Sequence, residues 1–178
     1  MARPLLLLLL VGGFGVTHLE FVCETVAVGN NLARGGKSSR SSSYSSVDES
    51  QAAIDGDRNT SYKSGSCSHN DFEMGSWWKV DLQELHQIAA VTVVNRQDCC
   101  GERLWGAEVR IGNSPDNSNP VCGTIANGTT NPVVTLCCCG MEGRYVSVVI
   151  PTRKEYLTLC EVEVYAAAPT PESGHGCW

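Results

Sequence analysis

Four stretches of the chain alternate apolar and polar residues with a period of two, which is the pattern of strands that bury one face of a sheet. Turns rich in Gly, Asn and Pro separate many of these short runs. Because such a succession is typical of packed antiparallel sheets, the sequence predicts an all-β sandwich, and its 178 residues suffice for a single domain. The predicted core residues are Trp78, Val80, Leu82, Ala107, Val109, Ile111, Val146, Val148, Ile150, Cys160, Val162 and Val164.

One short helix is predicted, in the run VDESQAAIDGD at residues 47–57. Acidic side chains stand early in this run of small residues, where they favour a helix N-terminus, and Gly56 ends it. No other helix is expected.

The two ends of the chain differ in composition from its centre. Arg3 precedes an apolar run from Leu5 to Val11 and then small residues, which is the pattern of a secretory signal peptide and is too short to span a bilayer. We therefore expect a secreted protein without membrane insertion. The assigned segments are a signal peptide (1–17), an N-terminal segment (18–25), the folded domain (26–166) and a solvated tail (167–178).

The formal net charge of −6 argues against two classes of partner. Nucleic acids and acidic membranes both bind proteins through clustered cations, and this chain has no cationic excess. Neither is expected to be a partner.

Ten cysteines in a secreted chain indicate disulfides. The adjacent cysteines at 137–139 lack the spacing that zinc ligands need, so zinc is disfavoured. We predict the pairs Cys67–Cys160 and Cys122–Cys137, worth about 4–5 and about 3 kcal/mol by loop closure. Cys23 and Cys177 flank the domain as a candidate pair, and Cys138 and Cys139 are left without an assigned partner.

Cys99 and Cys100 are neighbours in the sequence. Their Cα atoms lie ~3.8 Å apart, below the usual ~4.4–6.8 Å of a disulfide, so a bond between them would strain the backbone. Such a bond would form a rigid apolar ring, of a kind found at functional sites. Pairing with distant cysteines is the alternative, and the residues alone do not decide between the two.

His69, the run Arg96-Gln97-Asp98 and Arg103 stand at the spacing of a family motif, with the vicinal cysteines inside it. The motif resembles that of the F-type lectins, the fucose-binding fucolectins of fish plasma. WWKVDL, GRYV and LCEVEV agree with this family, and the resemblance covers residues 26–166. It implies a discoidin-like (F5/8 type C-like) jellyroll β-sandwich with one sugar site among its loops and a structural calcium ion.

L-Fucose is neutral, so binding it requires directed hydrogen bonds to hydroxyl groups and an apolar contact for its methyl group. The planar arginine fork suits the first requirement because it can reach two neighbouring oxygen atoms at once. The resemblance implies that His69, Arg96 and Arg103 hold the sugar oxygens. It also implies that Cys99 and Cys100 bond to each other and, with Tyr62, supply the apolar contacts. Asp98 would offset the repulsion between the arginines and fix their rotamers.

Residues 52–61, AAIDGDRNTS, superficially resemble a calcium loop of the EF-hand type. Counted from Asp55 as the first position, Gly56 stands at the second position and Ser66 at the twelfth. The EF-hand motif requires glycine at the sixth position and glutamate at the twelfth, so it is excluded. The family resemblance instead implies a cage of backbone and side-chain oxygens, and a solvated acidic turn is the alternative. The implied calcium ligands are Ala52, Asp55, Asp57, Ser66, Cys160 and Glu161.

The resulting functional prediction is a secreted, calcium-containing lectin that binds terminal L-fucose on microbial or host glycans in innate immunity. Homo-oligomers are expected, because linked weak sites gain avidity. Asn59 and Asn127 lie in glycosylation sequons. An enzyme using Cys99 or Cys100 with His69 as base is disfavoured, because an oxidised pair has no thiolate. A discoidin-like adhesion module that binds lipid head groups or protein remains the alternative.

Overall fold

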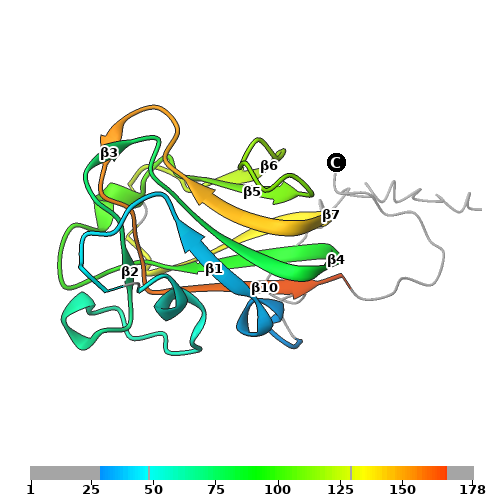
Figure 1. Ribbon diagram of the computed structural model, residues 1–178, viewed down its shortest axis with the longest axis horizontal. Helices are drawn as coiled ribbons and strands as arrows, with labels where there is room; N and C mark the ends of the chain where they lie inside the picture. The colour runs from blue at the N-terminus through cyan, green and yellow to red at the C-terminus, as the bar shows by residue number, and fades with distance from the viewer. Residues whose placement is uncertain (1–28, 48, 129, 168–178) are drawn as a thin grey trace, which may run out of the picture.

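The computed structural model describes residues 29–47, 49–128 and 130–167 (Figure 1). The predicted signal peptide, the N-terminal segment up to residue 25, most of the tail, and Cys23 and Cys177 lie outside these residues. Within the described ranges, no helix is both long and apolar enough to cross a membrane.

The described secondary structure is β-strands with short 3-10 helices, so the all-β prediction is confirmed. All of the strand pairs are antiparallel. The strands are β1 (Lys37–Arg40), β2 (Ser68–His69), β3 (Glu73–Met74), β4 (Trp77–Val94), β5 (Glu108–Gly112), β6 (Val121–Thr124), β7 (Val133–Val149), β8 (Lys154–Glu155), β9 (Thr158–Leu159) and β10 (Glu161–Ala166).

The main sheet has the order β1-β4-β7-β5-β6, and β10 pairs with β4 outside this path. Register shifts interrupt the pairing of β4 with β7 between Asp81 and His86 and again between Ile88 and Ala90. Before these shifts β4 pairs with β1, and after the first of them, from Ile88 to Val94, it pairs with β10. The long strands β4 and β7 therefore contribute both to the part of the sandwich that contains β1 and to the part that contains β10. They run nearly the full length of the sandwich in Figure 1.

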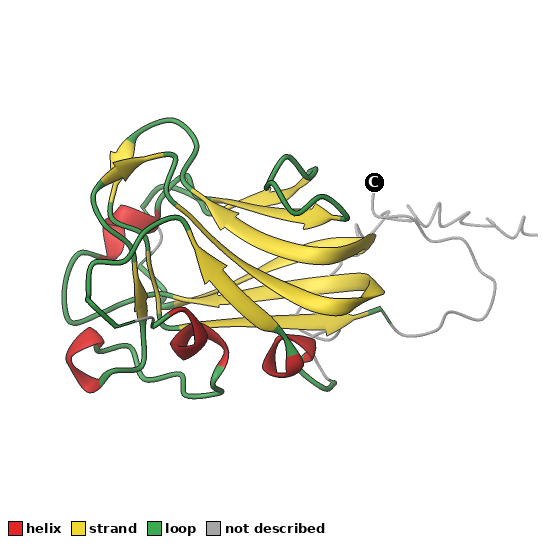
Figure 2. Cartoon of the chain, viewed as in Figure 1, coloured by secondary structure: helices red, strands yellow, loops and turns green. Residues whose placement is uncertain are grey.

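Two short ladders lie outside the main sheet. β2 pairs with β9, and β3 pairs with β8. Most of the loops and the short helices gather at the left end of the sandwich in Figure 2. This end carries the site described below.

The predicted core is confirmed, because all twelve predicted residues are buried, Leu82 being the most exposed of them at 6%. One feature of β10 differs from the prediction of a half-exposed strand. Glu161, Glu163 and Tyr165, on its other face, are buried too. The loop after η3 covers them, since Arg58 forms an ion pair with Glu163 and the Gly56 N–H donates to Glu161.

The predicted helix at 47–57 is present as the 3-10 helix η3 (Ser50–Ile54), but the prediction that it is the only helix is wrong. Three further 3-10 helices are described: η2 (Leu32–Gly35), η4 (Tyr62–Ser64) and η5 (Gly101–Leu104). A single turn of 3-10 helix has no apolar periodicity that a sequence pattern can reveal.

Two of the three predicted disulfides are confirmed, Cys67–Cys160 and Cys99–Cys100. The predicted Cys122–Cys137 pair is wrong, because Cys122 bonds to Cys138. Successive strand residues point to opposite faces. Cys138 is 2% exposed within the core cluster against which Cys122 packs, so its neighbour Cys137 points away from Cys122. Cys137 and Cys139 are themselves disulfide-bonded.

Candidate functional site

A pocket of about 240 Å³ opens at the loop end of the sandwich. Its walls come from the loop after β1, from η4 and β2, from the loop between β4 and η5, from η5 itself, and from the residue after β8. All six residues predicted to contact a ligand meet here, together with two tyrosines that were not predicted. The lining residues are Tyr44, Tyr62, His69, Arg96, Cys99, Cys100, Arg103 and Tyr156.

His69 is only 4% exposed. Its backbone carbonyl accepts hydrogen bonds from Arg40 Nη1 at 2.9 Å and from the Tyr44 N–H at 3.1 Å, which anchors the neighbouring loop. The Tyr44 ring stacks on the imidazole with centroids 4.6 Å apart, and Tyr62 meets it edge-on at 4.8 Å. Neither ring nitrogen of His69 has a hydrogen-bond partner among the described residues.

Burial, followed by the positive charges of Arg96, Arg103 and Arg40, lowers the pKa of His69 from 6.5 to about 4. The imidazole is therefore neutral at physiological pH and carries one donor and one acceptor nitrogen. A neutral imidazole can both donate to and accept from a hydroxyl group.

Arg96 follows β4 and is 9% exposed. Its Nε donates to Asp98 Oδ1 at 2.5 Å and its Nη2 to Asp98 Oδ2 at 3.1 Å, which makes a two-point contact. The guanidinium carbon lies 4.9 Å from the ring centroid of Tyr62. Hydrogen bonding to Arg96 lowers the pKa of Asp98, so the carboxylate stays ionised and holds the arginine rotamer.

Arg103 lies in η5, above the ring of Tyr156, with its guanidinium carbon 4.7 Å from the ring centroid. The nearest carboxylate is that of Glu155, whose Oε1 is 3.7 Å from Arg103 Nε. The expectation that Asp98 serves both arginines is therefore corrected: it pairs with Arg96, and Glu155 pairs with Arg103. Arg153 Nη2 fixes this turn by donating to the carbonyls of Arg103 at 2.8 Å and Trp105 at 2.6 Å.

The bonded Cys99–Cys100 pair lines the same pocket as the two arginines. Cys100 has φ 61° and ψ 29°, in the left-handed region that side chains other than glycine rarely adopt, at a cost on the order of 1 kcal/mol. The Gln97 N–H donates to the Thr60 carbonyl at 2.9 Å, and Asn95 Nδ2 donates to the Gly101 carbonyl at 2.8 Å. These bonds hold the loop that carries the apolar ring.

Sequence reasoning missed Tyr44, Tyr156 and Glu155. Tyr44 stands in the Ser-rich run SSSYSS, and Tyr156 follows the polar run RKE. A single aromatic residue in a polar loop is the only signal that the sequence offers for either tyrosine. Glu155 has no distinguishing pattern, because its role depends on the pairing of β8 with β3.

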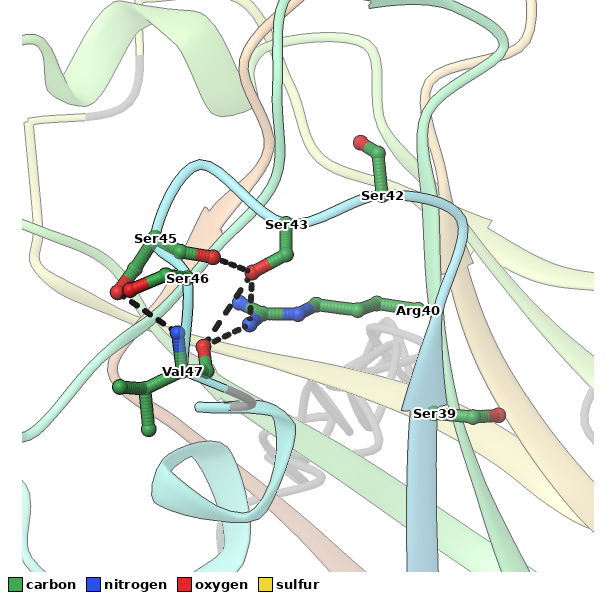
Figure 3. A pocket seen from close by; sticks show the side chains of 7 residues that line it. All are labelled: Ser39, Arg40, Ser42, Ser43, Ser45, Ser46 and Val47. Carbon is green, nitrogen blue, oxygen red and sulfur yellow. Dashed lines mark hydrogen bonds between the residues drawn. The ribbon is translucent and has the colours of Figure 1, made fainter.

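A larger hollow of about 410 Å³ lies beside the site, walled by Arg40, Val47 and five serines (Figure 3). The Arg40 side chain is 4% exposed and is committed to internal bonds. It donates to the His69 carbonyl, to Ser43 Oγ at 2.6 Å and to the Val47 carbonyl at 3.0 Å. Arg40 therefore links the Ser-rich loop to His69.

Several of the residues implied as calcium ligands lie where the loop after η3 crosses β10. Glu161 is fully buried, and both of its carboxylate oxygens accept the Gly56 N–H at 3.2 Å. Ser66 Oγ donates to Asp57 Oδ2 at 3.1 Å, and the Cys67–Cys160 bond joins the two segments. Burial, opposed by the Gly56 bond but reinforced by the charge of Asp55, raises the pKa of Glu161 to about 7.

A buried carboxylate without a cationic partner among the ion pairs of the described ranges fits a site for a hard cation. These same ranges contain no group of three or more His, Cys, Asp or Glu side chains placed to hold a metal ion. The implied set needs only two carboxylates, those of Asp55 and Glu161, because its other oxygens include backbone carbonyls.

The fold and the site together define a β-sandwich built to bind a small neutral polar ligand, as carbohydrate-binding domains do. Residues 52–148 match the family model of the NedA-like, galactose-binding domain. Fucolectin-5 of Anguilla japonica is 49% identical over 121 residues, which cover 66% of this chain and 64% of that protein.

Two solved structures are similar throughout most of the chain. A fucolectin from striped bass (Morone saxatilis) serum has a TM-score of 0.74 and 44% identity, covering 79% of this chain and 48% of that one. A Streptococcus pneumoniae fucose-binding module has a TM-score of 0.68 and 30% identity, covering 77% and 95%. The chain belongs to the F-type lectin (fucolectin) family. The discoidin-like fold is confirmed.

Proposed function

We propose that the protein is a lectin that binds terminal L-fucose in the 240 Å³ pocket. The observation that carries this proposal is the environment of His69. This buried neutral imidazole shares the pocket with two arginines, and both of its ring nitrogens are unpartnered among the described residues. A sugar hydroxyl group suits either ring nitrogen, because a hydroxyl can both donate and accept a hydrogen bond.

The other walls of the pocket suit the remaining groups of this sugar. Arg96 and Arg103 are oriented by separate carboxylates, so their free N–H groups are available in fixed directions to ring and hydroxyl oxygens. The Cys99–Cys100 ring and Tyr62 offer apolar surface for the methyl group of L-fucose. The names of the fucolectin relatives and of the fucose-binding module support the same ligand.

Calcium belongs to the proposal as a structural ion. Asp55 and Glu161 would supply charged oxygens, and Ala52, Asp57, Ser66 and Cys160 would supply the others. When bound, calcium neutralises the buried Glu161 carboxylate and ties the loop of residues 52–66 to β10. The ion stabilises the fold in this scheme, and the pocket residues alone contact the sugar.

We also propose that the protein is secreted. Three disulfides between described residues suit an oxidising compartment and support secretion. Recognition of fucosylated microbial or host surfaces in innate immunity is the role we propose, with homo-oligomers providing multivalent contact. Asn59 and Asn127 are exposed, as glycosylation at these sequons requires.

A glycan-binding screen on the oxidised, calcium-loaded protein tests the proposal. Glycans with terminal L-fucose should be retained, and their matched counterparts without fucose should not be. Vesicles of phosphatidylserine serve as the control for the lipid-binding alternative. Retention independent of fucose, or binding to these vesicles instead, contradicts the proposed function.

A further inference from the structure

An exposed phenylalanine lies at the edge of the pocket, where two short ladders meet. His69 of β2 pairs with Thr158 of β9, and Glu73 of β3 pairs with Glu155 of β8. Between the ladders, the Asn70 N–H donates to the Leu157 carbonyl at 2.9 Å. The antiparallel register therefore sets Phe72 beside Tyr156, whose ring lines the pocket.

The two rings form a continuous apolar surface, which we call the aromatic shelf and define as Phe72 and Tyr156. Their centroids are 5.2 Å apart and their planes are inclined by 43°. Phe72 is 54% exposed, so about half of this large apolar side chain faces solvent. Tyr156 also contacts His69, at 5.5 Å between centroids, and carries Arg103 over its ring. The shelf thus leads from the pocket outward.

The segment that carries Phe72 is fixed on both sides. The Glu73 carboxylate accepts hydrogen bonds from Ser41 Oγ and, at 2.6 Å, from Ser42 Oγ. The Asp71 N–H donates to Ser42 Oγ at 3.0 Å. A shelf held by backbone pairing and side-chain bonds is preorganised, so a ligand loses little free energy in ordering it.

A volume of about 240 Å³ suits one monosaccharide, since the pockets that hold drug-sized ligands measure about 300–1,000 Å³. A sugar glycosidically linked to the bound residue must therefore lie outside the pocket, against its rim. A pyranose ring presents a face of C–H groups, and this face packs against an aromatic ring as other apolar groups do.

We propose that the aromatic shelf is a second subsite, which takes the C–H face of the sugar to which the fucose is linked. This inference rests on the proposed binding of fucose in the pocket, and it assigns to Phe72 a role in choosing among fucosylated glycans. Tyr44 is exposed on the same rim, but it stacks directly on His69. Changes at Tyr44 therefore disturb the fucose pocket itself, whereas Phe72 does not contribute to the pocket lining.

The test compares methyl α-L-fucoside with the disaccharide α-L-fucosyl-galactose by calorimetric titration. The native protein should bind the disaccharide about two- to tenfold more tightly, which is the range for one aromatic contact. Phe72→Ala should remove this advantage and leave the affinity for methyl α-L-fucoside unchanged. Phe72→Tyr should retain the advantage, because it keeps the ring.

Leu85→Ala is the matched control, because Leu85 is also 54% exposed but does not line the pocket. It should change neither affinity. Equal affinity of the native protein for both sugars, or an equal loss for both in Phe72→Ala, overturns the subsite. If the native protein binds phosphatidylserine vesicles and Phe72→Ala abolishes this binding, the shelf is a lipid contact and the proposed sugar subsite is overturned. Failure of the native protein to bind methyl α-L-fucoside refutes the proposed function, and the subsite with it.

Discussion

The Nε atom of Arg103 lies 3.7 Å from Oε1 of Glu155, so the second pocket arginine has its own carboxylate, supplied by β8. Arg96 has an equivalent partner in Asp98. Each arginine also lies over a tyrosine ring, Arg96 over Tyr62 and Arg103 over Tyr156. The site therefore holds two similar units, each with a cation, an anion and an aromatic ring.

Glu155→Gln should weaken binding of L-fucose by about two- to fivefold, because it removes the charge that orients Arg103. The effect is small because the pair is partly exposed to solvent, where ion pairs contribute about 0.2–1 kcal/mol. Gln retains an acceptor for the Tyr156 N–H, which now donates to Glu155 Oε1 at 2.9 Å. Calorimetric titration measures the change, with Glu142→Gln as an exposed control on β7. Unchanged affinity in Glu155→Gln contradicts the orienting role.

The neutral state of His69 predicts a distinctive pH dependence. Its pKa is about 4 in the folded protein and about 6.5 when unfolded, so the unfolded chain takes up a proton first as the pH falls. The contribution to stability is fully present above pH 6.5 and is lost as the pH falls towards 4. This pH-dependent loss of stability amounts to about 3 kcal/mol, and it should be absent in His69→Asn, which cannot take up the proton.

Binding should follow the same protonation. The affinity for L-fucose should stay level from about pH 8 to about pH 5 and decline near pH 4. An NMR titration of the imidazole measures the pKa of His69, and calorimetric titration over the same pH range measures the affinity for L-fucose. A midpoint near 6.5 in either measurement means that His69 is not the buried neutral group found here.

Removing calcium should destabilise the protein without removing the pocket residues. A ligand that binds only the native state at hundredfold excess over its dissociation constant stabilises by about 2.7 kcal/mol, or roughly 5–10 °C in Tm for a chain of this size. Glu161→Gln should abolish this calcium-dependent rise, and Glu142→Gln should keep it. A melting curve of the native protein that excess chelator leaves unchanged rules out the structural ion.

The bond of Cys122 with Cys138 predicts which thiol each cysteine variant releases. Cys138→Ser should lower the free energy of unfolding by about 3 kcal/mol and expose the Cys122 thiol to maleimide. Cys137→Ser should leave Cys122 unlabelled, because the bond of Cys137 is to another cysteine. Peptide mass analysis after labelling identifies the thiol. Label on Cys122 in the Cys137→Ser variant contradicts the observed pairing.

Part of the fold was predictable because apolar and polar residues alternate at the start of β4 and in β5. The end of β4, from Ile88 to Val94, is buried at every residue and has no such alternation. Trp78, Val80 and Leu82 face the core as the pattern requires. The buried outer face of β10 was not predictable, since Glu161 and Glu163 look like solvent-facing residues in the sequence. They are buried because the loop after η3, which carries Arg58, lies over β10.

Five of the predicted pocket residues came from the motif and Tyr62 came from its family position, and the structure brings all six together. The residues that were missed depend on contacts between distant segments. Tyr44 reaches His69 because its N–H bonds the His69 carbonyl, and Glu155 reaches Arg103 because β8 pairs with β3. Neither relationship has a fixed spacing along the chain.

Arg96 is the most direct test of the fucose site. Charge-assisted hydrogen bonds contribute about 1.5–3 kcal/mol each, so Arg96→Ala should weaken L-fucose binding about tenfold to a hundredfold. Arg110→Ala is the matched control, because Arg110 also pairs with a carboxylate, that of Glu108, outside the pocket. Its affinity for L-fucose should equal that of the native protein.

Calorimetric titration of the native protein, Arg96→Ala and Arg110→Ala with L-fucose and D-galactose decides the matter. D-Galactose should bind much less well than L-fucose, because it carries a 6-hydroxyl where L-fucose carries a methyl group and has the opposite handedness. Arg96→Ala should weaken L-fucose binding at least tenfold, and Arg110→Ala should leave it unchanged. Equal affinity of the native protein for the two sugars, or an undiminished L-fucose signal in Arg96→Ala, contradicts it.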